Sequence, residues 1–147
     1  MSFLSLPDRA LSIRQPWVWA IINAGKRIEN RPRRFHYRGP ICLHASLYEP
    51  KWSDCRACLD VVSQVKGDRG TMRGLTREQG NISSIENSKE GRARGGIIGT
   101  AEIVDCIEAS DDPWFFGPFG LVLENVQPVE FIPVTGALGL FRWRDRL

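Results

Sequence analysis

The sequence lacks the short motifs that mark several large enzyme classes. It contains no glycine-rich P-loop, no dinucleotide-binding G-x-G-x-x-G, no zinc-protease H-E-x-x-H and no serine-centred G-x-S-x-G. ATP hydrolysis at a P-loop, nicotinamide-dependent redox chemistry and zinc proteolysis are therefore set aside.

Long apolar segments are absent as well. No apolar run approaches the roughly 18–20 residues that a membrane-spanning helix needs. The first 17 residues lack the basic start and the continuous apolar stretch of a signal peptide. We therefore expect a cytoplasmic protein with no membrane partner.

Histidine and cysteine are scarce. Cys55 and Cys58 form a C-x-x-C motif, which is half of a zinc site or a redox motif, but no second such pair and only two histidines are present. The chain has 147 residues, of which 42% are hydrophobic, so it can build one core without disulfides. We expect a single domain over residues 1–147 with buried free thiols, no metal site and no cofactor.

Charge is unevenly distributed along the chain. The net charge is +3, yet residues 1–40 hold eight basic residues against two acidic ones, whereas residues 102–130 hold seven acidic residues and no basic one. This segregation predicts one positive and one negative face, and the positive face favours an anionic partner. A solvated charged surface with no partner is the alternative.

The first third predicts strand, helix, strand and strand. Residues 10–14 alternate apolar and polar side chains, as do residues 41–45, and both patterns are typical of strands. Between Pro16 and Gly25 apolar residues recur at helical spacing, with proline at the first helical position and glycine at the end. A further short strand is expected at residues 27–31.

The middle of the chain predicts a helix and then an insertion. Residues 49–65 have apolar side chains at helical spacing, whereas residues 67–94 have no aromatic residue, many glycines and mixed charges. We interpret residues 67–94 as a long mobile insertion that contains one or two helical turns.

The last third alternates strand and turn patterns. Residues 96–107 predict a long strand that Gly99 allows to bend. Residues 111–120 form an aromatic loop that either plugs one end of a barrel or makes a stacking wall of a site. The pattern predicts an α+β fold, a small mixed β-barrel, closed or half-closed, with one or two helices packed against it; an open sandwich is the alternative. Three further short strands are expected at residues 121–126, 131–134 and 138–143.

Lys26, Glu29 and Arg31 are ionisable and lie within six positions, which suggests a polar site. Lys26 and Glu29 are close enough to meet, and strand alternation places Glu29 and Arg31 on the same side. In a cleft, Glu29 would act as a general base on water and Lys26 would stabilise an oxyanion. On an exposed surface, the two would form a structural ion pair of little energetic value.

Further candidates lie at the ends of the predicted elements. Arg14, Gln15 and Trp17 stand where strand gives way to helix, and they suit an anion and a stacked base. His44 and Ser46 share a strand face, where a hydrogen-bonding role is favoured because the spacing supplies no third group to orient a Ser–His pair. A phosphate-contacting role and a solvated strand edge are equal alternatives for Arg33, Arg34 and Arg38.

Residues 11–31 and 96–143 together resemble the ASCH domain, a branch of the PUA-like superfamily. The signature G-x-K-x-x-E-x-R aligns with residues 24–31 (AGKRIENR), which share the lysine, glutamate and arginine, while Ala24 stands in place of the first glycine. Further matches to one subgroup are LSIRQPW at residues 11–17, HAS at residues 44–46 and GALGLFRW at residues 136–143.

The resemblance implies a pseudo-barrel with a cleft beside the first helix, and a ligand that is RNA or a modified nucleoside. Some relatives are amidohydrolases that remove an acetyl group from acetylcytidine. Their catalytic lysine aligns with Lys26, and a catalytic threonine aligns with Glu29. At least one bacterial relative has been described as a metal-dependent ribonuclease, for which we expect magnesium.

Our leading hypothesis is an RNA- or nucleoside-binding domain with no obligate protein partner. A hydrolase in which Lys26 and Glu29 are catalytic is the alternative, and a protein–protein adaptor that uses the acidic strip of residues 102–130 is a third hypothesis. The predicted ligand-binding residues are Ser12, Arg14, Gln15, Trp17, Asn30, Arg31, Arg33, His44 and Ser46.

Overall fold

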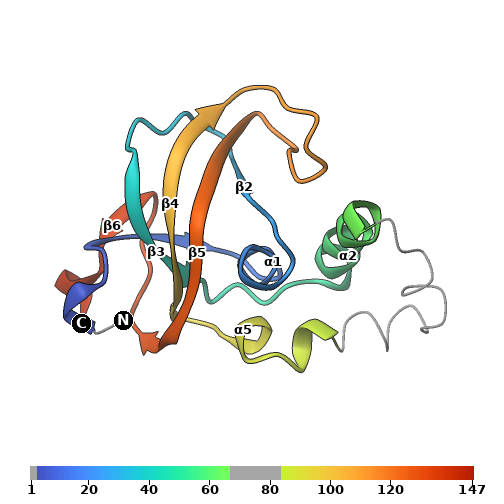
Figure 1. Ribbon diagram of the computed structural model, residues 1–147. Helices are drawn as coiled ribbons and strands as arrows, with labels where there is room; N and C mark the ends of the chain where they lie inside the picture. Colours follow the sequence, from blue (N-terminus) through green and yellow to red (C-terminus); the bar gives the residue numbers. More distant parts are fainter. Residues whose placement is uncertain (1–2, 67–83) are drawn as a thin grey trace.

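The computed structural model describes residues 3–66 and 84–147, and its main feature is one curled, mixed sheet (Figure 1). The six strands follow the order β2-β5-β4-β3-β1-β6, in which β1 and β3 are parallel and all other neighbours are antiparallel. The expected half-closed barrel with packed helices is confirmed. The strands are β1 (Arg9–Ile13), β2 (Ile28–Arg31), β3 (Gly39–Ala45), β4 (Gly96–Ile107), β5 (Phe119–Pro133) and β6 (Leu140–Arg142).

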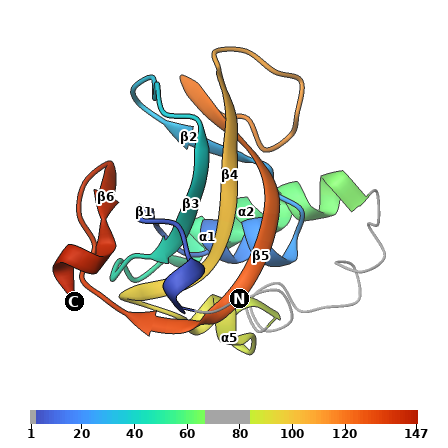
Figure 2. The same ribbon diagram turned by 60° about the vertical axis from the view of Figure 1, so that its left-hand side comes forward.

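In the described part of the chain, helices pack against the sheet, and the first of them lies between the sheet and the second (Figure 2). Val18 and Ile21 pack into the core of the sheet, whereas Trp19 and Ala20 on the same helix pack against α2. None of the helices among the described residues is long and apolar enough to cross a membrane. The helices are α1 (Trp17–Asn23), α2 (Trp52–Lys66) and α5 (Lys89–Arg92), and short 3₁₀ turns occupy Phe3–Ser5 and Trp143–Arg146.

Strand β3 is buried on both faces, which explains its nearly continuous apolar sequence. Ile41 and Leu43 belong to the core shared with α1, while Cys42 packs on the opposite face with Phe141 and Trp143. The C-terminal residues therefore cover the outer face of the sheet. This arrangement brings the parallel strands β1 and β3, with Ser12 opposite His44 in register, into the middle of the molecule.

Strand β5 corrects one prediction, because residues 121–134 do not form two separate strands. Residues 121–133 belong to one strand, Phe119–Pro133, whose pairing with β4 shifts register several times and whose Asn125 has a positive φ of 52°. Strand β2 pairs with β5 only as far as Val122. Beyond that point β5 is an edge strand on one side, where a proline such as Pro128 is tolerated because it removes no ladder hydrogen bond.

The described part of the predicted insertion packs against α1. Ser88 caps α5 by accepting a hydrogen bond from the backbone N–H of Gly91 (2.9 Å), and the side chain of Ile85 is buried. The amide of Gln15 donates to the carbonyl oxygens of Glu90 and Ala93. The expected helical turns are present, but residues 84–94 are packed rather than loose; the remainder, residues 67–83, lies outside the described residues.

Candidate functional site

A cavity of about 900 Å³ opens where the C-terminal ends of β1 and β3 meet β2 and the loop of residues 135–139. Eight of the residues predicted from the sequence lie on its wall. They are joined there by residues from the loops after β2, β3 and β5. The lining residues are Ser12, Arg14, Trp17, Glu29, Asn30, Arg31, Pro32, His44, Ser46, Leu47, Thr135, Gly136, Ala137, Leu138 and Gly139.

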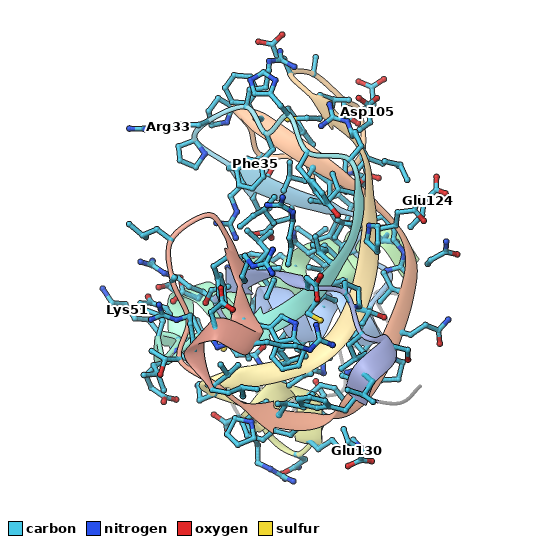
Figure 3. The ribbon with its side chains drawn as sticks, turned by 90° about the vertical axis from the view of Figure 1, so that its left-hand side faces the viewer. Arg33, Phe35, Lys51, Asp105, Glu124 and Glu130 are labelled. Atoms are coloured by element: carbon cyan, nitrogen blue, oxygen red, sulfur yellow. The ribbon has the colours of Figure 1, made fainter. Side chains whose placement is uncertain are left out.

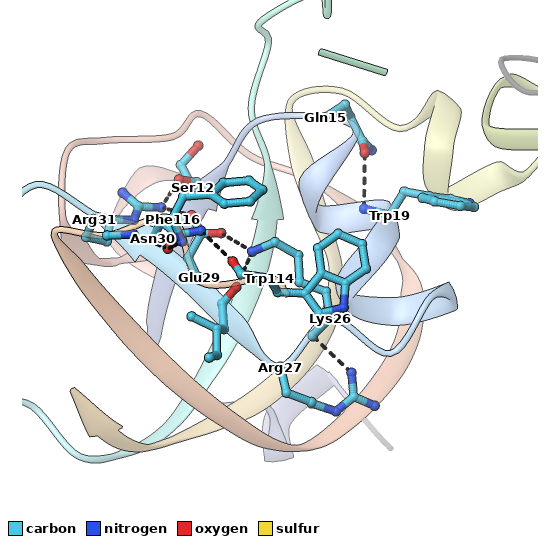
Figure 4. Close-up of polar contacts among 12 residues, drawn as sticks. Ser12, Gln15, Trp19, Lys26, Arg27, Glu29, Asn30, Arg31, Trp114 and Phe116 are labelled. Atoms are coloured by element: carbon cyan, nitrogen blue, oxygen red, sulfur yellow. Dashed lines mark hydrogen bonds and ion pairs between the residues drawn. The ribbon is translucent and has the colours of Figure 1, made fainter. Parts of the chain in front are cut away.

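Lys26, Glu29 and Arg31 form one ion-paired row beside the cavity (Figure 4). The Nζ of Lys26 lies 3.2 Å from Glu29 Oε1 and also donates to the carbonyl oxygen of Ile28, while Arg31 Nη2 lies 3.0 Å from Glu29 Oε2. Lys26 is only 1% exposed and is not a lining residue, so Glu29 and Arg31 are the members that reach the cavity. The predicted Lys26–Glu29 meeting is confirmed, and the row carries one surplus positive charge.

Arg31 also contacts the neighbouring strand. Its Nη2 donates to the backbone oxygen of Ser12 at 2.9 Å, which holds the guanidinium against β1. The Nε of Arg31 is buried and finds no hydrogen-bond partner among the described residues. An unpaired buried donor is costly. This atom is enclosed by protein, and Arg31 reaches the cavity through the rest of its side chain, which is 19% exposed.

His44 is hydrogen-bonded at both ring nitrogens. Nε2 lies 2.7 Å from the carbonyl oxygen of Val134, and Nδ1 lies 2.9 Å from Ser12 Oγ. The carbonyl oxygen can only accept, so Nε2 carries the proton and Nδ1 accepts the hydroxyl proton of Ser12. Burial of the ring, which is 1% exposed, lowers the pKa of His44; the bond to Val134 opposes this shift, and Arg146 adds to it.

Trp17 gives the cavity an aromatic wall. Trp17 is half-buried, and its ring packs edge-to-face against Phe116 at 5.9 Å between centroids. Asn30 fixes this geometry, because its Oδ1 accepts from the backbone N–H groups of Phe116 (2.8 Å) and Gly117 (3.0 Å). Its Nδ2 donates to the carbonyl oxygen of Trp114 at 2.9 Å. Asn30 therefore positions the aromatic loop, in which Trp114 is buried in the core and Phe116 packs against Trp17.

Arg14 lies at the edge of the cavity, over the ring of Tyr48 at 4.3 Å. The Tyr48 hydroxyl donates to Asp54 at 2.9 Å, and this hydrogen bond raises the pKa of Tyr48. Ser46, which accepts a hydrogen bond from the backbone N–H of Tyr48 at 3.3 Å, lines the same side. These contacts hold an exposed guanidinium where a ligand can reach it.

Two of the predicted ligand-binding residues lie outside the cavity. Gln15 is fully buried, where its Oε1 accepts from the N–H of Trp19 at 3.2 Å and its amide group holds the α5 segment. Arg33 is exposed and projects from the same end of the molecule as Asp105 (Figure 3). Near it, Arg34 pairs with Glu108 at 2.8 Å and Arg38 with Asp105 at 3.8 Å, so acidic residues interrupt the predicted positive face.

The cysteines are buried free thiols, as predicted. Burial raises the pKa of Cys58, the second cysteine of the C-x-x-C motif, to about 12. A thiol in this state is a poor nucleophile and a poor metal ligand near neutral pH. Among the described residues, no group of three or more His, Cys, Asp and Glu side chains is placed to hold a metal ion.

The loop of residues 135–139 is the part of the site that sequence reasoning missed. Leu138 at its tip is 99% exposed, and Leu47 across the cavity is 75% exposed. A Cβ atom on Gly136 would lie 2.7 Å from His44 Cε1 and 3.0 Å from Ser12 Oγ, so only glycine fits above this pair. The sequence signal that could have indicated this loop is Leu138, an apolar residue in a short segment between Gly136 and Gly139.

Comparison with known proteins gives one match. The family model of the ASCH domain matches residues 11–116, which includes β1, α1, β2, β3, β4 and most of the aromatic loop. No curated protein matches the chain. Because the match covers well over half of the 147 residues, the chain belongs to the ASCH domain family, within the PUA-like superfamily.

Proposed function

We propose that the cavity binds RNA or a modified nucleoside. Membership of the ASCH family suggests RNA binding or a related function. The observation that carries the proposal is the joint placement of Arg14, Arg31 and Trp17 on one cavity wall. Two cationic groups and an indole ring are what a phosphate and a base require.

The charge on the cavity wall favours an anion. Glu29 is the only acidic lining residue in the described part of the chain, and both of its carboxylate oxygens already accept from cations. The side chain of Arg31 is 19% exposed and lines the cavity, and Arg14 is exposed. Arginine binds phosphate through paired N–H donors, so these two guanidinium groups can share one phosphodiester.

The apolar parts of the wall favour a base. Trp17 lines the cavity and is in edge-to-face contact with Phe116, whose loop Asn30 holds in place, so the aromatic surface is present before a ligand binds. Stacking of a base on an aromatic side chain contributes about 1–3 kcal/mol. A volume of about 900 Å³ lies within the range of small-molecule sites and admits a nucleotide.

The hydrolase alternative with Lys26 and Glu29 gains no support from the geometry. Lys26 Nζ is buried and bound to Ile28 and Glu29. A lysine that acts on a substrate has to reach it, which would require this row to open. Binding is therefore the function that these residues favour.

The test is fluorescence anisotropy with a labelled single-stranded RNA, with acetylcytidine and cytidine as competitors. Wild-type protein should bind, with log affinity falling linearly as log salt rises. Arg14→Gln should weaken binding and reduce the salt slope by about one, and the matched variant Arg34→Gln, outside the cavity, should change neither.

Chromatography of the acetylcytidine samples gives the second readout. Cytidine should form only if the cavity also hydrolyses the acyl amide, so this readout separates binding from turnover. Equal loss of affinity in Arg14→Gln and Arg34→Gln, or no binding by the wild type of either RNA or nucleoside, would overturn the proposal.

A further inference from the structure

Ser12 and His44 form a hydrogen-bonded chain that the proposed binding function does not use. The chain runs from Ser12 Oγ to His44 Nδ1 (2.9 Å) and from His44 Nε2 to the carbonyl oxygen of Val134 (2.7 Å). A nucleophile, a base and a group that orients the base are therefore in contact, in the order that activated serines require. The Val134 carbonyl supplies the third group that sequence spacing did not reveal.

The protonation state of His44 suits a base. Its Nε2 proton is fixed by Val134, so the lone pair of Nδ1 is directed at the hydroxyl of Ser12. Ser12 on β1, the Phe141 ring of β6 at 5.7 Å and Arg146 beyond β6 face the imidazole. Arg146 is the charged group among them, and it disfavours the imidazolium.

Ser12 and His44 both line the cavity, and the pair is closely covered on one side. Gly136 lies over the pair, and the position that a Cβ would fill is 3.0 Å from Ser12 Oγ. Arg146 holds the Gly136 loop through the carbonyl oxygens of Thr135 (2.9 Å) and Gly136 (3.0 Å). On the other side, the guanidinium of Arg31 is bound to the backbone oxygen of Ser12 at 2.9 Å.

From this geometry we propose that Ser12 is a catalytic nucleophile and His44 its general base, for acyl transfer from a small ester or amide bound in the cavity. Ser12 Oγ bonds to the carbonyl carbon while its proton moves to His44 Nδ1. The displaced electron pair moves to the carbonyl oxygen, and the positive charge of the neighbouring Arg31 guanidinium, whose side chain lines the cavity, stabilises it.

The remaining steps regenerate the serine. Collapse of the tetrahedral intermediate breaks the bond to the alcohol or amine, which leaves with the proton from Nδ1. Water then attacks the acyl-serine, giving up a proton to Nδ1 as it adds to the carbonyl carbon. The Ser12 Oγ–carbon bond breaks, Oγ takes that proton back, and the carboxylic acid is released.

The experiment is covalent labelling of the full chain with a fluorophosphonate, followed by peptide mapping by mass spectrometry. The phosphonyl adduct should form on Ser12 and not on Ser46, which lines the same cavity without a histidine partner. The wild type should also hydrolyse p-nitrophenyl acetate with release of acetate. Ser12→Ala should abolish labelling, and Ser110→Ala, a serine outside the cavity, should leave it unchanged.

The pH profile separates catalysis from a merely structural hydrogen bond. Because the pKa of His44 is lowered from 6.5, labelling should be constant above pH 6.5 and fall at more acidic pH. Loss of the base in His44→Gln should slow labelling about 100-fold or more, provided that circular dichroism shows a native fold.

Absence of a Ser12 adduct on folded wild-type protein would overturn the proposal, and so would a rate equal to that of Ser46. Neither result bears on RNA binding, because anisotropy measures that function separately. The two proposals can therefore fail independently.

Discussion

Two groups of arginines that are close in sequence have different surroundings in the structure. Arg14 and Arg31 line the cavity, where the single acidic neighbour is already shared between two cations. Arg34 and Arg38 lie in the loop between β2 and β3, called here the outer loop (residues 32–38), and pair with acidic side chains at or just beyond the end of β4. The same basic segment of the sequence thus gives a cavity with surplus positive charge and an outer loop whose positive charges are paired with carboxylates.

The difference shows that charge counts along a sequence do not give the local field. Strand pairing decides which charges meet, because β4 brings its acidic end to the outer loop and no acidic segment to the cavity. An ion pair on an exposed surface contributes about 0–1 kcal/mol to stability. In a buried row of charges, removal of any one member leaves its partner buried and unpaired, which lowers the stability of the folded protein much more. Matched substitutions in the two regions test this contrast.

The largest effect is expected for Glu29→Gln. This substitution leaves the buried ammonium of Lys26 without its counter-ion, and removal of one partner of a buried pair costs about 3–5 kcal/mol. The matched change in the outer loop region, Asp105→Asn, should cost less than about 1 kcal/mol. Urea unfolding measures both, and similar losses for the two variants would contradict the contrast.

Trp17→Ala should weaken RNA binding by about 1–3 kcal/mol, or roughly 5- to 150-fold, through loss of stacking. The outer loop region also has a cation–aromatic pair, since Arg34 lies over the Phe119 ring at 5.1 Å. Phe119→Leu therefore serves as the control and should leave affinity unchanged. Anisotropy titrations measure both, and a larger loss for Phe119→Leu would place the ligand outside the cavity.

Stability should fall at acidic pH because of His44. Its folded-state pKa lies below the ordinary value of 6.5, so below pH 6.5 the unfolded chain binds more protons and folding becomes less favourable. The loss is at most about 1.4 kcal/mol per pH unit for one proton, and full stability returns above pH 6.5.

Unfolding by urea between pH 5 and pH 7.5 measures this effect. His36→Gln, which changes the exposed histidine of the outer loop, keeps His44 and should retain the drop. A folded His44→Asn variant should show a smaller drop. A drop that persists undiminished in His44→Asn would show that another group is responsible.

The smallest effect is expected for Glu108→Gln. Its partner Arg34 is partly exposed and Glu108 is more exposed still, so the 2.8 Å pair is screened by solvent. The variant should change the free energy of unfolding by less than about 1 kcal/mol and leave a freer cation in the outer loop. If Glu108→Gln raised RNA affinity by as much as Arg14→Gln lowers it, the outer loop would be a second RNA-binding surface that competes with the cavity.

Local patterns predicted much of the fold and part of the site. The alternation of residues 41–45 predicted strand β3 and which of its side chains share a face. The spacing of Lys26, Glu29 and Arg31 predicted that these side chains meet. Both predictions depend only on residues that are close in sequence. The continuity of β5 was missed because tertiary pairing with β4 overrides the breaks at Asn125 and Pro128.

Non-local contacts account for the rest. The partner of His44 is Ser12, more than 30 positions away on a parallel strand, rather than the neighbouring Ser46. The Val134 carbonyl carries no side-chain signal in any sequence pattern. Asn30 lines the cavity as predicted, and it also fixes a loop more than 80 positions later in the chain, which no local pattern indicates.

The most direct test of the cavity as the binding site is a ¹H–¹⁵N correlation titration of the labelled protein with a short single-stranded RNA. Shift changes should appear at the backbone amides of Ser12, Arg31 and Gly136 and at the indole N–H of Trp17, which surround the cavity. Changes confined to the outer loop and the end of β4, with none at these four groups, would contradict the central claim.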